Sequence, residues 1–543
     1  MSPGGAASAS PGLNGVSAAW AFRFAAVVTA LAFAIGLLSP GFVVNSWSHL
    51  ELSRTVFTDF YRLNTIRNLD TSSPYSQAFP PLWSVIIAIF RRVADLGIYT
   101  GYFLNFPVCL GLLAALMLLF RRIDLPEWAG AACYLSLFGF APFQGEALGA
   151  RTIPLSLALI TGALAVLFRE RLSLPRAALA GLLTGLACLT RFDALTPACA
   201  IGLAFAVRSW RMERKIGRAA AIAAIYFVVL GATLSPMIAY GMKHFGKVFP
   251  SDNTRMVLQA KGGGVLDYYK TPPAPDLFRR PGKWIAGLVL YKARIIAHLG
   301  LSIPGPENQS ALLMLMAIIP VIWKPPQLSA ASRQFIVLAL LLIPVMLLPS
   351  VLGGILDSRY YSGPVLLLFA MLFVLLASIT RGAWNARRAG WLLLAAAAPL
   401  YPLFLQPTML FRHDPVSLKT VLAPLSPTPR MQMLTDAVRR DSAGGPHRLL
   451  FTDSGIAAAK YGALTGEPVI MIPVLVSGTF ADFARDWHIT HVYEGTLERA
   501  VWEASQRANT DFVDKINSSG VVLVPLDLPG LYRVQLGDGP PHS

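Results

Sequence analysis

The sequence predicts a polytopic α-helical membrane protein of about eleven spans that carries a small α/β domain at its C-terminal end. Hydrophobic residues make up 55% of the 543 residues and charged residues only 14%. Soluble chains contain about 25% charged residues. Many apolar runs approach the length of about 20 residues that crosses a bilayer. Too few polar side chains remain to cover a soluble body of this size, which excludes a soluble multidomain protein.

The transmembrane part is expected to extend over residues 19–406. Before it, residues 1–18 are mostly small and polar, which is typical of a disordered tail. The first apolar run, Trp20–Leu38, is too long for a signal peptide and follows no basic segment, so we expect an uncleaved anchor. The further expected spans are 102–120, 128–143, 153–168, 177–190, 194–207, 219–241, 310–323, 334–353, 362–380 and 389–406.

The net charge is +17, and the distribution of the basic residues predicts the orientation in the membrane. These residues gather in every second short loop. Examples are Arg121, Arg169, Arg214 and Arg387. Cytoplasmic loops are enriched in Lys and Arg, so these loops and the N-terminus are expected inside and the C-terminal region outside. The outer segment 242–309 is also basic, but loops of about 60 residues or more escape this rule. We expect a multi-pass protein of a bacterial inner or cell membrane.

In residues 407–543 the pattern changes to short β-type runs that alternate with amphipathic helices. Arg448–Thr452 precedes Ile456–Leu464, and Val469–Val474 precedes Phe480–Trp487. This alternation predicts an extracytoplasmic α/β domain with a largely parallel sheet. It contains no glycine-rich nucleotide motif, so we expect it to serve packing or acceptor docking.

Three short outer turns each combine one acid with one arginine. Charged side chains are costly near a membrane and need a partner or a function. Each pair can be a local salt bridge that holds a helical hairpin. Alternatively, the three turns converge on an anionic ligand, because arginine binds phosphate through two parallel hydrogen bonds. The pairs are Glu146 and Arg151, Arg191 and Asp193, and Asp357 and Arg359.

The first outer loop, residues 39–101, contains the strongest candidate for a general base. Helical periodicity is predicted over Thr55–Leu69, with Asp59 on its polar face. Arg62 lies one turn away and favours the carboxylate, and aromatic neighbours such as Tyr61 are expected to limit its contact with water.

After a Pro- and Ser-rich break, Leu82–Phe90 is too short for a full span and predicts an interfacial helix. Glu51, Asp70 and Glu146 compete with Asp59 as acids. Asp70 lies in a turn context (NLDTSS), where a structural role is the simpler reading. The cysteines lie in apolar runs without CxxC spacing, so we expect neither a disulfide framework nor a zinc site.

The order of these motifs resembles the GT-C glycosyltransferase superfamily, which includes protein O-mannosyltransferases, aminoarabinose transferases and glycosylphosphatidylinositol mannosyltransferases. The motifs are TDFY, AFPPLW, ART, LTRFDAL and SRYYSGP, and they cover most of residues 19–406. The resemblance implies an inverting transfer of a sugar from a polyprenyl-phosphate donor, outside the membrane, to a glycan, lipid or protein acceptor.

The resemblance also implies roles for individual residues. Asp59 matches the catalytic base, and Arg151, Arg191 and Arg359 match cations that hold the lipid phosphate. Phe79-Pro80-Pro81 replaces the Lys-Pro of several relatives, so one phosphate-binding cation is missing there. The first loop has a single acid instead of an acidic pair, so no cofactor is expected and a divalent metal is not indicated. The supporting residues are Tyr61, Arg62, Glu146, Asp193, Asp357 and Tyr360.

Two other functions stay open. A polysaccharide polymerase or ligase would use lipid-diphosphate donors. A transporter or flippase would show inverted repeats and charges at mid-membrane, whereas the charges here lie at span ends. No nucleic-acid partner is expected, because the cations belong to loops between apolar spans.

Overall fold

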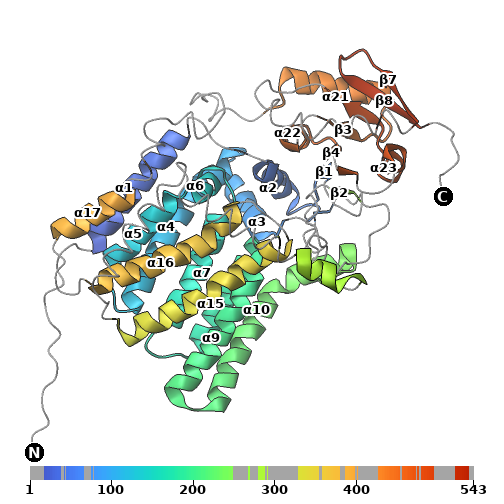
Figure 1. Ribbon diagram of the computed structural model, residues 1–543. Helices are drawn as coiled ribbons and strands as arrows, with labels where there is room; N and C mark the ends of the chain where they lie inside the picture. Colours follow the sequence, from blue (N-terminus) through green and yellow to red (C-terminus); the bar gives the residue numbers. More distant parts are fainter. Residues whose placement is uncertain are drawn as a thin grey trace, which may run out of the picture.

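The computed structural model shows a helical bundle joined to a small α/β domain (Figure 1). The predicted tail, the predicted span 310–323 and most of the outer segment 242–309 lie outside the described residues. The structure describes residues 18–37, 42, 44–60, 62–66, 75–76, 79–248, 267–268, 279–287, 290, 328–353, 358–379, 386–397, 400, 426–452, 455–471, 474–475, 479–494, 516 and 520–536.

The bundle consists of apolar helices (Figure 1). In the described part of the chain, five helices are long and apolar enough to cross a membrane, or six if α6 and α7, bent by 109°, form one span. The predicted membrane-type helical architecture is confirmed, and the count of eleven spans stays a prediction. The bundle helices are α1 (Ala18–Gly36), α4 (Tyr99–Arg122), α5 (Glu127–Phe138), α6 (Ala141–Leu148), α7 (Ile153–Leu167), α8 (Leu174–Thr190), α9 (Leu195–Glu213), α10 (Ile216–Phe245), α15 (Ala330–Gly353), α16 (Ser362–Ile379) and α17 (Ala386–Ala397).

Close packing of α8 against α10 depends on a glycine. A Cβ atom at Gly181 would lie 2.5 Å from the carbonyl oxygen of Tyr226, so any side chain there would push the helices apart. The Tyr226 hydroxyl forms a hydrogen bond with the Thr184 hydroxyl in α8 at 2.8 Å. It also donates to the carbonyl of Ala198 in α9 at 2.7 Å. These contacts fix the ends of α8 and α9, between which one acid/arginine turn lies.

One predicted span and one predicted turn are wrong. The run 128–143 was expected to be one helix and 144–152 a turn, but α5 ends at Phe138 and α6 continues to Leu148. Phe140 adopts an extended conformation (φ −78°, ψ 110°), and a proline in the first turn of α6 starts a new helix. Glu146 therefore lies on a helix and not in a turn.

The first outer loop also differs from the expected long helix over Thr55–Leu69. Helix α2 (Val44–Thr55) ends where that helix was expected to begin, and turns lead into strand β1 (Thr65–Ile66). The local helical periodicity does not determine the structure here, because β1 pairs with the C-terminal sheet. The local sequence does not encode that contact. The helix expected at Leu82–Phe90 is observed as α3 (Leu82–Arg91).

The C-terminal domain contains a six-stranded sheet in the order β1-β4-β3-β6-β8-β7. The four strands from β1 to β6 are parallel, while β8 runs antiparallel to β6 and β7. A second pair joins β2 (Asp267–Tyr268) to β5 (Val474–Leu475). The remaining elements are α21 (Pro429–Asp441), β3 (Leu449–Phe451), α22 (Gly455–Thr465), β4 (Val469–Met471), α23 (Phe480–Asp486), β6 (His491–Tyr493), β7 (Val521–Pro525) and β8 (Leu531–Leu536).

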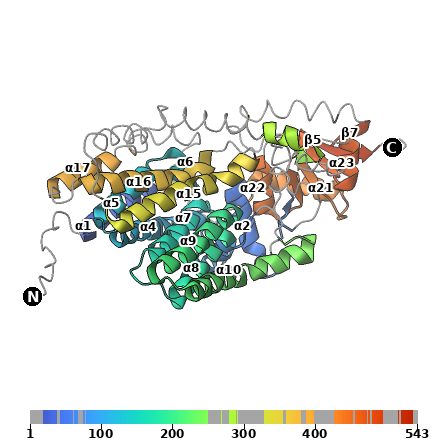
Figure 2. The ribbon, with the colours of Figure 1, turned by 60° about the horizontal axis from the view of Figure 1, so that its bottom comes forward.

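The α/β domain and the acid/arginine turns lie at the same end of the bundle. Helix α2 of the first outer loop packs against α22 of the domain, and the views agree on this neighbourhood (Figures 1 and 2). Helix α8 ends, and α7 and α16 begin, at the acid/arginine turns. The basic turns after α4 and α9 belong to the opposite helix ends. This alternation agrees with the loop pattern from which the orientation was predicted.

Candidate functional site

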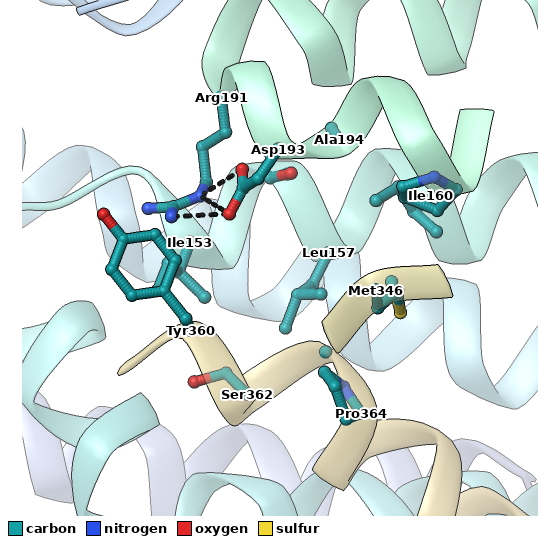
Figure 3. Close-up of a pocket in the computed structure, with 13 residues that line it drawn as sticks. Ile153, Leu157, Ile160, Arg191, Asp193, Ala194, Met346, Tyr360, Ser362 and Pro364 are labelled. Atoms are coloured by element: carbon teal, nitrogen blue, oxygen red, sulfur yellow. Dashed lines mark hydrogen bonds and ion pairs between the residues drawn. The ribbon is translucent and has the colours of Figure 1, made fainter. Parts of the chain in front are cut away.

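An ion pair between Arg191 and Asp193 forms the centre of the candidate site (Figure 3). Helix α8 ends at Thr190, Arg191 is extended (φ −152°, ψ 130°), and a 3₁₀ turn, η1 (Phe192–Ala194), follows. The guanidinium binds the carboxylate in two places, with Nε–Oδ1 at 2.9 Å and Nη2–Oδ2 at 2.8 Å. Only 16% of the Arg191 side chain is exposed. The carboxylate thus holds the guanidinium in one orientation.

The other two acid/arginine turns contribute groups to the same place. Arg191 Nη1 makes a long contact of 3.5 Å with Thr152 Oγ1, at the start of α7. The Arg191 guanidinium carbon lies 5.0 Å from the ring centroid of Tyr360, which belongs to the 3₁₀ turn η2 (Ser358–Tyr361). Residues from the other two turns, far apart in the sequence, therefore lie against Arg191.

Glu146 and Arg151 form a second, more buried ion pair beside this centre. Their closest atoms are 2.6 Å apart, and only 2% of the Glu146 side chain is exposed. Arg151 Nε is buried without a hydrogen-bond partner among the described residues. Asn105 donates to the carbonyls of Ala147 and Arg151, and Ala150 adopts a left-handed conformation (φ 57°) that turns the chain.

A cavity opens beside Arg191 between α7, α9, α15 and α16. Its polar members are Ser156, Arg191, Asp193, Tyr360 and Ser362. Its walls are apolar, formed by residues such as Ile153, Leu157, Ile160, Met346 and Pro364. A cation beside an apolar wall at a helix-bundle end suits an amphiphilic anion, whose head and tail need these two environments.

The structure thus brings together five of the sequence-predicted site residues. The Glu146–Arg151 and Arg191–Asp193 pairs are local salt bridges, as one reading expected, and convergence on one anionic ligand stays a prediction. Arg191 and Asp193 line the cavity, whereas Glu146 and Arg151 are not among its lining residues. Asp357 and the side chain of Arg359 lie outside the described residues.

Asp59 lies in a different cluster and does not line this cavity. Its Oδ1 accepts a hydrogen bond from the Tyr75 hydroxyl at 3.1 Å, and its Oδ2 pairs with Arg62 Nη1 at 3.3 Å. The expected shielding by neighbouring aromatic rings is wrong for the described residues: 41% of the Asp59 side chain is exposed. Phe60 turns away and packs edge-on against Tyr240 of α10. Tyr61 lies outside the described residues.

Tyr75 is a functional candidate that the sequence reasoning missed. Its hydrogen bond to Asp59 raises the pKa of the Tyr75 hydroxyl, since the phenolate could not donate it. The ring lies 3.9 Å from that of His244, and the Tyr240 hydroxyl donates to the Ser76 carbonyl at 2.9 Å. Helix α10 thereby fixes the segment around Tyr75. The only available signal was a tyrosine inside the Pro- and Ser-rich break of the same loop.

Glu51, a competing acid, is buried on α2 with 1% of its surface exposed. Burial raises the pKa of its carboxyl from 4.5 to about 7, although hydrogen bonds from Thr65 and Asn64 and the charge of Arg54 oppose this shift. Arg91 and Asp95, themselves ion-paired, complete the charged surroundings through Arg54. The Oε2 atom of Glu51 has no hydrogen-bond partner among the described residues, which disfavours the charged form of this carboxyl.

Glu51→Gln should therefore be more stable than the parent chain at pH 8 and closer to it at pH 5. Because folding raises this pKa, the stability from protonated Glu51 is complete below pH 4.5 and is lost as the pH rises to about 7. The loss is at most about 3 kcal/mol, and Gln cannot ionise. Thermal unfolding of both full chains at the two pH values measures the difference. An equal difference at both values would contradict a raised pKa.

No family model matches the sequence, and no curated protein matches it. Among solved structures, arabinofuranosyltransferase AftD from Mycobacteria matches with a TM-score of 0.51 and 14% identity over 97% of this chain, which spans only 42% of that chain. ArnT from Cupriavidus metallidurans, solved with undecaprenyl phosphate, has a TM-score of 0.49 at 14% identity over 96% of this chain and 98% of its own. AglB from Archaeoglobus fulgidus, an oligosaccharyltransferase, has 0.45 at 12% over 86% and 69%. The match to AftD shows a shared fold, as the resemblance of the motifs led us to expect.

Proposed function

We propose that the chain is an inverting glycosyltransferase that moves a sugar from a polyprenyl-phosphate donor to a glycan, lipid or protein acceptor on the outer face of the membrane. The observation that carries the proposal is the convergence of Arg191, Asp193 and Tyr360 at one end of an apolar cavity in the helical bundle. The fold shared with AftD, an arabinofuranosyltransferase, supports the reaction class.

In this proposal the cavity holds the lipid phosphate. Apolar side chains such as Leu157 and Met346 contact the first part of the lipid, and Arg191 contacts the phosphate. The phosphate gains charge as the sugar leaves, and cations already fixed in place stabilise that charge without reorganisation. Asp193 supplies this fixation, since it holds the guanidinium at two atoms. Arg151 and Arg359 add positive charge from the neighbouring turns.

Asp59 acts as the general base in the proposed reaction. It accepts the proton of the acceptor hydroxyl, whose oxygen attacks the anomeric carbon from the side opposite the phosphate, which inverts the configuration. Arg62 and Tyr75 both contact the carboxylate and hold it in place. Phe192, next to Arg191, packs on the apolar cluster that also contains Val56 and Tyr240, so the two polar clusters flank one packed unit.

Purified full chain incubated with a panel of polyprenyl-phosphate sugars tests the proposal. We expect consumption of at least one monophosphate donor, with release of polyprenyl phosphate. Consumption of lipid-diphosphate donors alone would favour a polymerase or ligase. Movement of lipid-linked sugar across vesicles without any consumption would favour a flippase, and either result would overturn the proposal.

The proposed orientation predicts where reporter fusions are active. Fusions after Arg122, Arg214 and Arg387 should report the cytoplasm, because these residues belong to basic short loops. A fusion after Ser543 should report the outside, since the α/β domain packs on the first outer loop. Residues 1–18 would then form an inner tail, 19–406 the membrane domain and 407–543 the outer domain. A cytoplasmic signal from the last fusion would contradict the whole topology.

A further inference from the structure

The first outer loop supplies the edge strand of the C-terminal sheet. Strand β1 pairs in parallel with β4, with Thr65 opposite Val469 and Ile66 opposite Ile470. The backbone N–H of Val469 donates to the Asn64 carbonyl at 3.0 Å. A segment only a few residues after Asp59 is thus part of a sheet whose other strands come from the C-terminal domain.

Helix α2 holds the same segment from the opposite side. The buried Oε1 atom of Glu51 accepts hydrogen bonds from the backbone N–H groups of Asn64 and Thr65, the latter at 2.9 Å. Arg54, one turn further along, donates to the Ala463 carbonyl in α22. The start of β1 is therefore enclosed between α2 and the α/β domain: Glu51 holds its backbone, and Arg54 joins α2 to α22.

A glycine in α22 makes room for this strand. A Cβ atom at Gly462 would lie 2.5 Å from Thr65 Oγ1 and 2.8 Å from Val469 Cγ1. Real Cβ atoms essentially never approach other atoms below 3.0 Å, so any other residue would force the facing Thr65 and Val469 side chains of β1 and β4 to shift. Gly462 therefore lies where the first outer loop meets the C-terminal domain.

The turn that carries Asp59 is fixed between these anchors. At its start the Asp59 N–H donates to the Thr55 carbonyl at 3.0 Å, at the end of α2. Thr55 Oγ1 also donates to the Arg62 carbonyl at 2.8 Å, and the Arg62 N–H donates to the Asp59 carbonyl at 3.1 Å. A shift of β1 would therefore pass to Asp59 through a short, hydrogen-bonded turn.

We propose that the α/β domain positions the general base, with Glu51 and Gly462 as positioning residues that dock β1 and so place Asp59. The inference rests on the proposed function, because it assigns the domain a role in that reaction. Neither residue lines the cavity at Arg191, so they act on the base and not on the donor. The domain then does more than bind an acceptor: the loop has its catalytic geometry only while the domain is docked.

Hydrogen–deuterium exchange on the full chain tests the docking independently of catalysis. Gly462→Ala should accelerate exchange in peptides covering residues 56–66 by about tenfold or more. The added methyl group weakens the docking of β1, which then opens locally. Glu51→Ala should do the same from the other side. Gly231→Ala is the matched control, since a Cβ at that helical glycine meets nothing within 4 Å. Unchanged exchange in both variants would overturn the inference.

Transfer rates on the same preparations test the positioning role. Gly462→Ala and Glu51→Ala should lower kcat for the donor by tenfold or more with little change in KM, as expected for a displaced base. Glu51→Gln keeps the Oε1 acceptor and should retain most of the activity. Faster exchange with unchanged kcat would overturn the positioning role. If the parent chain consumes no donor, the proposed function fails, while the exchange result still decides whether the domain docks the loop.

Discussion

Replacing Asp59 with Asn should reduce sugar transfer by about 10²–10⁴-fold, the usual effect of removing a general base. Asn keeps the shape of the side chain and an oxygen that can accept from the Tyr75 hydroxyl, but it cannot take a proton. Donor binding should stay near the parent value, because Asp59 does not line the cavity at Arg191. Initial rates with a consumed polyprenyl-phosphate sugar, together with equilibrium binding of the donor, separate the two effects.

Asp124→Asn is the matched control for this experiment. Asp124 follows α4 at the opposite end of the bundle and adopts a left-handed conformation (φ 63°) that Asn tolerates well. The control should leave transfer unchanged. If Asp59→Asn turns over at a near-parent rate, Asp59 is not the base, and Glu146 becomes the next acid to test.

The sequence was informative wherever a single segment determines its own structure. Apolar runs such as 102–120 and 219–241 became α4 and α10, since their side chains have no favourable place in water. In the C-terminal part, the predicted β-type runs Arg448–Thr452 and Val469–Val474 contain strands β3 and β4. The acid/arginine pairs could be recognised because charged side chains near a membrane are costly and need a partner or a function.

The sequence failed where distant segments compete with local pattern. Residues 55–69 have helical periodicity, but the chain after Thr55 follows the hydrogen bonds offered by Glu51 and by β4. Glu51 is separated from the loop by a turn whose geometry the sequence does not give, and β4 is separated from it by hundreds of residues. The contact of Tyr75 with Asp59 has the same origin, because a Pro- and Ser-rich break gives no direction to a side chain.

The surroundings of Arg191 could also be predicted from the sequence only in part. The sequence paired it with Asp193 two residues away, which the structure shows as a two-point ion pair. The sequence grouped Tyr360 with Arg191 only through the resemblance of their motifs. The packing of α15 onto η1 and of α15 and α16 onto η2 places that ring against the guanidinium and completes the cavity.

Arg191→Ala should weaken donor binding by roughly 1.5–3 kcal/mol, the range for a hydrogen bond to a charged group, or about 10–150-fold in Kd. Arg191→Lys should recover only part of this loss, since an ammonium group cannot hold Asp193 and a phosphate in the fork geometry of arginine. Equilibrium binding of a polyprenyl-phosphate sugar to the purified full chain measures both variants.

The local salt bridge makes a competing prediction that the same variants can separate. If Arg191 only closes its own turn, Arg191→Ala lowers thermal stability by leaving the Asp193 carboxylate unpaired, and Asp193→Asn in the same chain restores it without any effect on donor affinity. If Arg191 binds phosphate, the double variant regains stability but keeps the loss of affinity. Arg121→Ala is the matched control, because that exposed arginine pairs with Glu127 at the other end of the bundle. Parent affinity in the double variant would remove Arg191 from the phosphate site and leave the cavity without its central cation.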